Sequence, residues 1–236
     1  MKPIAIVFGA GSAIAQALLP HLATNYRLIT VSRSPESNTS SSQAHYVCDY
    51  SEPDLARLAG QVAENWGSVS LVFCAVGLLH CETLSPEKKL ADLSERTLSA
   101  YFRVNSVIPA LVLKTCVPLM PKLEASKAVF LSAKIAGISD NRLGGWYGYR
   151  ASKAALNMLI KTASLELARS HRRLCLVALH PGTTDSPLSA PFTASLPPER
   201  LFSPDNTADR LWRVIESLGP EDTGRFLHWD GSDLPW

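Results

Sequence analysis

The chain has 236 residues, of which 46% are hydrophobic and 19% charged, and its formal net charge is +2. This composition is typical of one globular domain with a sizeable core, and the balanced charge without a Lys/Arg-rich run predicts no nucleic-acid partner. The five cysteines form no Cys-x-x-Cys pair, so we expect free thiols in a reducing, cytoplasmic compartment. The histidines lack metal-ligand spacing and the apolar start is too short for a membrane span, so we expect neither a metal site nor a membrane anchor.

The first element is a short apolar run, Ile4 to Phe8, that predicts a buried parallel strand. It leads through the small-residue turn from Gly9 to Ala15 into a helix. Backbone N–H groups and the helix dipole at such a turn favour a pyrophosphate group. The turn therefore indicates a dinucleotide site, with an ordinary tight turn between strand and helix as the alternative.

A second strand is predicted for residues 27–32, and it ends at Ser32 and Arg33. In dinucleotide-binding folds an acidic residue at this strand end holds the ribose 2′-hydroxyl, whereas an arginine accommodates a 2′-phosphate. Arg33 is present and no acidic residue occurs before Glu36. We therefore predict NADP(H) rather than NAD(H), the alternative being a solvated arginine with no ligand.

The remaining chain alternates between predicted strands and helices after a polar segment, residues 34–43, with little helix potential. The expected strands are 45–49, 69–75, 127–132, 173–179 and 224–229, and the expected helices are 54–66, 84–98, 100–120 (disturbed at Pro109), 147–169 and 205–218, with Asp205 as N-cap. Such alternation predicts an α/β fold: one Rossmann-type domain over residues 1–236, a doubly wound parallel sheet of about seven strands with helices on both faces. Gly9, Arg33, Asp49 and Gly77 fall at strand ends, where such sheets bind ligands.

A long proline-rich connection spans residues 183–204 between the sixth strand and the last helix. Connections of this length inside a compact domain are usually functional, and this one begins at the ligand-binding edge. We interpret it as a lid over a substrate, with a merely decorative surface loop as the alternative.

Tyr149 and Lys153 lie four residues apart on one face of the helix predicted for residues 147–169. A neighbouring ammonium group stabilises a phenolate, so we expect it to lower the tyrosine pKa from its ordinary value of about 10. The pair would then act as the general acid for reducing a carbonyl group. Taken alone, the same spacing is also common on solvated helix faces.

Together these motifs resemble the short-chain dehydrogenase/reductase family over essentially the whole chain. The resemblance is carried by the turn at Gly9, the strand end from Cys74 to Gly77, Asn105, the Tyr149 and Lys153 pair, and Pro181-Gly182. Within the family, the runs from Ser139 to Tyr147 and from His180 to Thr183, and the Gly-Arg-Phe ending, resemble the C-factor-like subgroup.

The resemblance implies that Tyr149 protonates the carbonyl oxygen as hydride arrives from the nicotinamide. Lys153 would lower the pKa of Tyr149 and hold the ribose, and Asn105 would position a water molecule. The implied cofactor-binding residues are Gly9, Ser12, Ala13 and Ile14 at the pyrophosphate, Ser32 and Arg33 at the 2′-phosphate, Asp49 and Tyr50 at adenine, Ala75, Val76 and Gly77 along the ribose, and Pro181, Gly182, Thr184 and Ser186 at the carboxamide.

Three positions depart from the family pattern. The second and third turn glycines are Ala13 and Ala15, whose methyl groups can crowd the pyrophosphate, and Cys74 replaces an asparagine. The serine that holds the substrate oxygen in related sequences falls on Ala133. Either Ser132 or Ser139 substitutes for it, or Tyr149 alone holds the oxygen.

Two functions follow from this resemblance. The favoured one is an NADPH-dependent carbonyl reductase, or the reverse alcohol dehydrogenase, acting on a small or medium apolar carbonyl compound. The competing one is an NADP-binding regulatory or cell-signalling protein with little or no catalysis. Because helices equivalent to residues 100–120 and 147–169 pair subunits in related proteins, we expect a homodimer or homotetramer.

Overall fold

The computed structural model describes residues 2–35, 41–139, 141–194 and 196–236, and its centre is a parallel sheet. Seven strands pair in the order β3-β2-β1-β4-β5-β6-β9, which confirms the doubly wound sheet expected from the sequence. The strands are β1 Ile4–Phe8, β2 Arg27–Ser32, β3 Ala44–Val47, β4 Val69–Cys74, β5 Ser126–Leu131, β6 Leu174–Leu179 and β9 Phe226–Leu227. The strand order reverses direction between β1 and β4, and the two strand ends there form the edge at which such sheets bind ligands.

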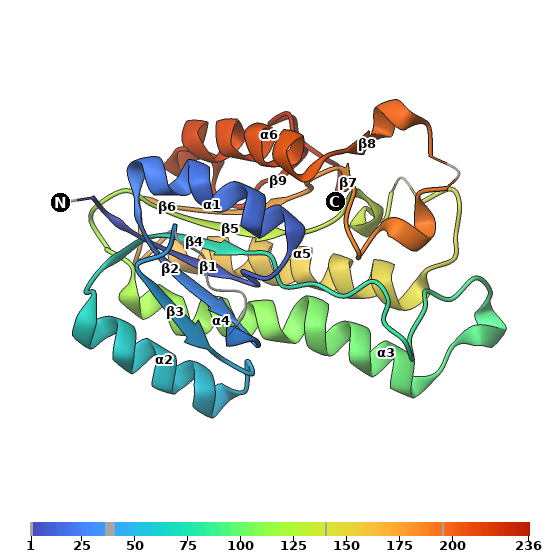
Figure 1. Cartoon of the computed structure of the whole chain (residues 1–236), viewed down its shortest axis with the longest axis horizontal. Helices are drawn as coiled ribbons and strands as arrows, with labels where there is room; N and C mark the ends of the chain where they lie inside the picture. Colours follow the sequence, from blue (N-terminus) through green and yellow to red (C-terminus); the bar gives the residue numbers. More distant parts are fainter. Residues whose placement is uncertain (1, 36–40, 140, 195) are drawn as a thin grey trace.

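Helices cover both faces of this sheet (Figure 1). Helices α1 Ala13–Asn25 and α6 Pro204–Ser217 lie on one face, and α2 Glu52–Asn65, α4 Ile108–Cys116 and α5 Tyr147–Leu167 on the other. Because the central strands are buried on both faces, each is a nearly continuous apolar run rather than an alternating one. The core accordingly forms two clusters, one on each side of the sheet.

The helical segment before β5 differs from the sequence expectation. Residues 84–98 were expected to be helical, but only a 3₁₀ turn, Leu90–Asp92, precedes α3 Glu95–Phe102. The disturbance expected at Pro109 lies just before it, in a π-helical turn at Arg103–Val107. A wider turn relieves the clash that a proline ring makes with the carbonyl group four residues earlier.

The helical run Glu95–Leu119 is long and apolar enough, by length and composition alone, to cross a membrane. Its Val112 and Cys116 side chains are buried against the sheet, in the cluster that also contains α5. These two side chains pack as core residues, while 39% of the most apolar window of the run is buried. Helix α6 begins at Pro204 with Ser203 as its N-cap, not Asp205, because the Ser203 hydroxyl accepts the N–H of Asn206.

The carboxyl ends of the strands point toward the right-hand end of Figure 1, where the longest loops gather. Two short strands, β7 Thr183–Thr184 and β8 Leu201–Phe202, pair in parallel and close the base of the segment 183–204. This segment therefore stands at the edge where ligands bind in doubly wound sheets.

Candidate active site

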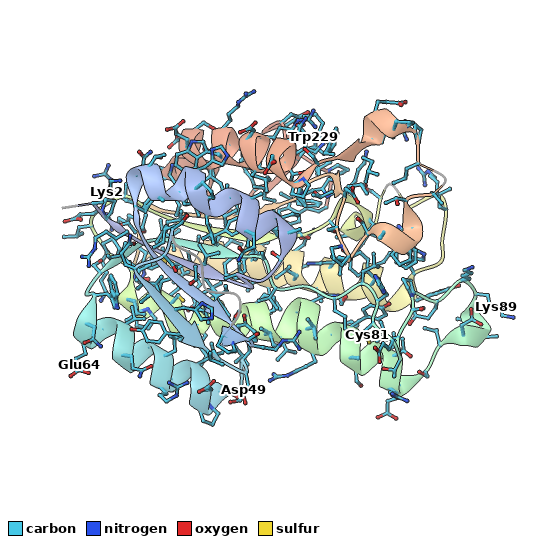
Figure 2. All side chains as sticks on the ribbon, viewed as in Figure 1. Lys2, Asp49, Glu64, Cys81, Lys89 and Trp229 are labelled. Atoms are coloured by element: carbon cyan, nitrogen blue, oxygen red, sulfur yellow. The ribbon has the colours of Figure 1, made fainter. Side chains whose placement is uncertain are left out.

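A cavity of roughly 1250 Å³ extends along the carboxyl edge of the sheet. Figure 2 labels two of its lining residues, Asp49 after β3 and Cys81 on the loop after β4. The structure brings together in this cavity all of the residues that the sequence placed at a cofactor, together with Tyr149, Lys153 and Ser132. Asn105 and Ser139 do not line it.

The turn after β1 requires glycine at its first position. Gly9 has φ +72°, and a Cβ atom there would lie 2.8 Å from the backbone carbon of Ala75. Ser12 caps α1 by accepting the N–H of Ala15 at 3.2 Å, which leaves the helix N-terminus at the cavity wall. The methyl group of Ala15 is buried in the core between α1 and the sheet, so the fold accommodates this departure from glycine.

At the end of β2 a hydrogen-bonded turn presents Arg33 to the cavity. The Ser32 hydroxyl donates to the carbonyl oxygen of Ser34 at 2.6 Å and accepts its N–H at 3.2 Å. The ring of His45 lies 3.2 Å from the same hydroxyl. Ser32 therefore shapes the turn, while the Arg33 side chain is exposed at the mouth of the cavity.

Of the two residues after β3, Tyr50 is buried and supports the Gly9 turn, whereas Asp49 is exposed. Tyr50 has φ +64° and its phenol oxygen accepts the N–H of Gly9 at 3.1 Å, so the buried ring supports the Gly9 turn from below. Asp49 is exposed, and its carboxylate accepts the N–H of Ser51 at 2.7 Å. Of the two residues expected at adenine, Asp49 is therefore the one whose side chain is exposed at the mouth of the cavity.

Tyr149 and Lys153 lie on the first turns of α5, which contacts the segment after β5. The Lys153 ammonium donates to the carbonyl oxygen of Leu131 at 2.9 Å, and burial lowers the pKa of Lys153 to about 8. Burial raises the pKa of Tyr149 to about 12. The expectation that Lys153 lowers the tyrosine pKa was therefore wrong: desolvation of Tyr149 dominates, and the Lys153 ammonium group is bonded to the Leu131 carbonyl oxygen.

Asn105 is completely buried in the π-helical turn, where its side chain joins two segments of the chain. Its side-chain amide donates to the carbonyl oxygen of Leu78 at 2.9 Å and accepts the N–H of Leu78 at 2.7 Å. The same amide nitrogen also donates to the hydroxyl of Ser152 at 3.0 Å. Asn105 thus ties the segment after β4 to α5 immediately beside Lys153.

Neither candidate serine directs a free hydroxyl proton toward Tyr149. Ser132 donates to the side-chain oxygen of Asn157 at 2.6 Å, inside the core. Ser139 is exposed, and its hydroxyl donates to the backbone oxygen of Trp236 at 3.4 Å. A role for Ser132 at a substrate oxygen would require it to exchange its Asn157 bond, whereas Ala133 lines the cavity with a methyl group only.

Glu87 is a site residue that sequence reasoning missed. Its side chain is 3% exposed, and one carboxylate oxygen accepts the N–H of Gly148 at 3.0 Å in the first turn of α5. A Cβ atom at Gly148 would lie 2.4 Å from the ring of Tyr101. The only signal in the sequence was Gly148 itself, between two tyrosines at the start of a predicted helix, and nothing there indicated its partner 61 residues away.

Aromatic side chains close the end of the cavity that carries Tyr149. Phe192, on the segment 183–204, packs edge-on against Trp146 and His80 with ring centroids 5.0 and 5.6 Å apart. The His80 ring also contacts the carbonyl oxygen of Pro187 at 2.9 Å. Trp146 in turn packs on Tyr149, 6.1 Å between centroids. The segment 183–204 therefore lies against the wall of the cavity that carries Tyr149.

A doubly wound sheet whose ligand edge combines a glycine turn, a helix N-terminus, a half-buried Tyr149 and a buried Lys153 defines a dinucleotide-binding α/β fold. The chain matches the family described as short chain dehydrogenase over residues 3–196. It belongs to that family, and it is an oxidoreductase of the short-chain type.

Two relatives illustrate the range of the family. The C-signal protein of Myxococcus xanthus is 31% identical over 147 residues, covering 62% of this chain and 83% of that protein. The 1-hydroxy-2-glutathionyl-2-methyl-3-butene dehydrogenase of a Rhodococcus species is 27% identical over 186 residues, covering 79% of this chain and 76% of that protein.

Solved structures share the fold across the whole chain. The carbonyl reductase Sniffer of D. melanogaster superposes with a TM-score of 0.84 at 20% identity, covering all of both chains. An NADPH-bound carbonyl reductase from chicken fatty liver gives 0.83 at 20% identity, covering 100% of this chain and 94% of that one. At this identity the likeness establishes the fold alone.

Proposed function

We propose that this chain is an NADPH-dependent carbonyl reductase, or the reverse alcohol dehydrogenase, with Tyr149 as the general acid. The observation that carries the proposal is the position of Tyr149 and Lys153, a helical turn apart, in the same cavity as the Gly9 turn and Arg33. A hydride donor held from the turn to the pair would meet a proton donor at the reacting carbonyl group.

The residues of the cavity fit a phosphorylated nicotinamide dinucleotide. The N-terminus of α1 offers backbone N–H groups and a positive dipole end to a diphosphate, and exposed Arg33 offers a guanidinium group to a 2′-phosphate. Gly77 lines the cavity near Lys153, since a Cβ atom there would lie 3.6 Å from the ammonium nitrogen. When bound, NADPH supplies the hydride.

The proton step rests on the chain's own residues. Burial keeps the Tyr149 phenol protonated throughout the physiological range, because its pKa lies near 12. Tyr149 would donate this proton to the carbonyl oxygen, and the Lys153 ammonium, once released from the Leu131 carbonyl oxygen, would stabilise the resulting phenolate. Asn105 holds the helix turn that carries Lys153 through its bond to Ser152, and Trp146 and Phe192 would shield the reacting group from water.

A regulatory function is the competing candidate. The likeness to the C-signal protein and the bond that commits the Ser132 hydroxyl to Asn157 both favour it. By analogy with an oxyanion hole, the loss of a donor to the substrate oxygen would cost roughly 2.7–4 kcal/mol. Under this candidate the cavity binds NADP while turnover is residual.

The test is NADPH consumption with a panel of aldehydes, ketones and quinones, measured for the native protein and for Tyr149→Phe. The reductase predicts turnover that disappears in Tyr149→Phe while NADPH binding, measured by fluorescence titration, persists. Tight NADPH binding without turnover of any panel member would favour the regulatory function. Unchanged turnover in Tyr149→Phe would remove Tyr149 as the acid.

The protein is further proposed to act as a homo-oligomer through α4 and α5. Met158 and Leu165 on α5 are 66% and 64% exposed, and an apolar groove of about 450 Å³ separates the two helices. A second copy would bury these side chains, since large apolar groups exposed on one helix face favour association.

A further inference from the structure

The charges that line the cavity are strongly unbalanced. Among the described residues, Asp49 is the one carboxylate in the wall. The cationic side chains in the wall are Arg33, Arg103, Lys134, Arg142, Arg150 and Lys153. A cleft lined by one sign of charge raises the local concentration of ligands of the other sign.

A dinucleotide accounts for only part of this positive charge. Arg33 lies at the end of β2, and Arg103 donates to the backbone oxygen of Tyr50 at 3.3 Å, so both stand at the Gly9 end of the cavity. Lys153 is buried beside Tyr149. The remaining three cations lie on the segments that flank Tyr149, where a substrate rather than the phosphates of the cofactor would stand.

Arg150 joins the two segments that carry the other two cations. Its guanidinium donates to the backbone oxygens of Ile135 at 3.4 Å and Gly144 at 3.3 Å, which ties the 3₁₀ turn Lys134–Ala136 to the loop before α5. Lys134 directly precedes Ile135, and Arg142 lies two residues before Gly144. Both side chains are exposed and both line the cavity, from the two segments that Arg150 joins.

Among the residues that the structure describes, no carboxylate lines this rim beside Lys134 and Arg142. Glu82 and Asp185 are exposed and lie outside the cavity wall, and Glu87 is buried behind the first turn of α5 on Gly148. The wall between the cations is apolar and aromatic, formed by Leu143, Trp146 and Phe192 among others. The rim therefore pairs an apolar surface with positive charge.

The geometry points to a carbonyl substrate that carries a carboxylate: an oxo acid with an apolar or aromatic body, its anionic group held by Lys134 and Arg142 while its carbonyl oxygen reaches Tyr149. This inference rests on the proposed reductase function, and it names the substrate class of that same site. The aromatic wall of Trp146 and Phe192 would take the apolar body of the acid.

Two matched pairs of compounds test it: 4-acetylbenzoate against its methyl ester, and 4-oxo-4-phenylbutanoate against its methyl ester. Each pair shares one ketone and differs in one negative charge. With NADPH, the native protein should reduce at least one acid with kcat/KM at least about tenfold above its ester, which corresponds to 1.4 kcal/mol of discrimination. The acid-to-ester ratio should fall toward one in the Lys134→Gln, Arg142→Gln double variant and in high salt.

Lys122→Gln and Arg169→Gln are the matched controls, because both residues are exposed cations outside the cavity, and both should keep the native ratio. Equal or better use of both esters, or a ratio that survives in the double variant, would overturn the inference while leaving the reductase function intact.

Calorimetric titration of each acid and each ester into the NADP-loaded Tyr149→Phe variant distinguishes recognition of the carboxylate from the reductase function. Binding of an acid but not its ester, without any turnover by the native protein, would support anion recognition and remove the reductase function. Equal binding of both compounds would overturn anion recognition whatever the turnover.

Discussion

Glu87, on the loop after β4, accepts a hydrogen bond from the backbone N–H of Gly148 at 3.0 Å, one residue before Tyr149. The backbone oxygen of Glu87 also accepts the N–H of Trp146. One buried residue thus binds the start of α5 through both its side chain and its backbone. The position of Tyr149 depends on this loop as well as on its own helix.

We therefore expect Glu87→Ala to lower both stability and activity. The variant leaves the Gly148 N–H without its acceptor in a buried site, which costs about 1–3 kcal/mol of the free energy of unfolding. It also loosens the turn that carries Tyr149, so kcat/KM should fall severalfold. Glu87→Gln retains an acceptor oxygen and should remain closer to the native protein in both urea unfolding and NADPH consumption. Equal, negligible effects of both variants would contradict this role.

Lys153 predicts a pH-dependent contribution to stability. Burial lowers its pKa from 10.5 to about 8, so between these values the unfolded chain binds a proton that the folded chain has released. The contribution of Lys153 to the free energy of unfolding is thus lowest below pH 8 and rises toward pH 10.5. The rise is about 1.4 kcal/mol for each unit of pKa difference between the folded and unfolded chain.

The measurement is urea unfolding of the native protein and of Lys153→Met from pH 7 to 9.5, the variant serving as the reference for the other groups that titrate in this range. The free energy of unfolding of the native protein should rise relative to the variant above pH 8. A difference that stays constant across this range would show that the folded and unfolded chains hold the Lys153 proton alike.

Arg33 should discriminate between the two nicotinamide cofactors. Its side chain is exposed at the end of β2, and a hydrogen bond between charged groups is worth about 1.5–3 kcal/mol. Arg33→Ala should therefore weaken NADPH binding by roughly tenfold to a hundredfold while leaving NADH binding nearly unchanged. Fluorescence titration with each cofactor measures this, with Arg169→Ala as the control. An equal loss for both cofactors would refute the assignment of Arg33 to the 2′-phosphate.

A charge placed on the exposed face of α5 should separate the subunits. Met158→Glu with Leu165→Glu puts two carboxylates where a second copy would bury apolar side chains, so the oligomer should dissociate. Light scattering after size-exclusion chromatography measures the mass. Leu123→Glu is the matched control, since Leu123 is 82% exposed and lies in the loop before β5, and it should leave the mass unchanged. A native protein that is already monomeric would contradict the proposal.

The sequence predicted those parts of the site that depend on local pattern. Short apolar runs that end at glycine or polar residues predict the strand ends and the glycine turn. Helix geometry predicts that Tyr149 and Lys153 share one helix face. The sequence alone therefore placed these residues at one edge of the sheet. The sheet order then brought them together as expected.

The remaining features depend on contacts between distant segments. The Ser132 hydroxyl is committed by Asn157, 25 residues later, and Tyr149 keeps a high pKa because packing desolvates it. The partner of Gly148 lies 61 residues earlier in the chain. No periodicity or spacing encodes such pairs, since they arise only when helices and loops pack against one another.

A crystal structure of the protein with bound NADP measures most directly whether Tyr149 and Lys153 serve the cofactor. We expect the nicotinamide C4 to face the Tyr149 hydroxyl and the Lys153 ammonium to contact the nicotinamide ribose. A nicotinamide ring bound away from α5, or a Tyr149 hydroxyl turned from it, would contradict the roles assigned to Tyr149 and Lys153.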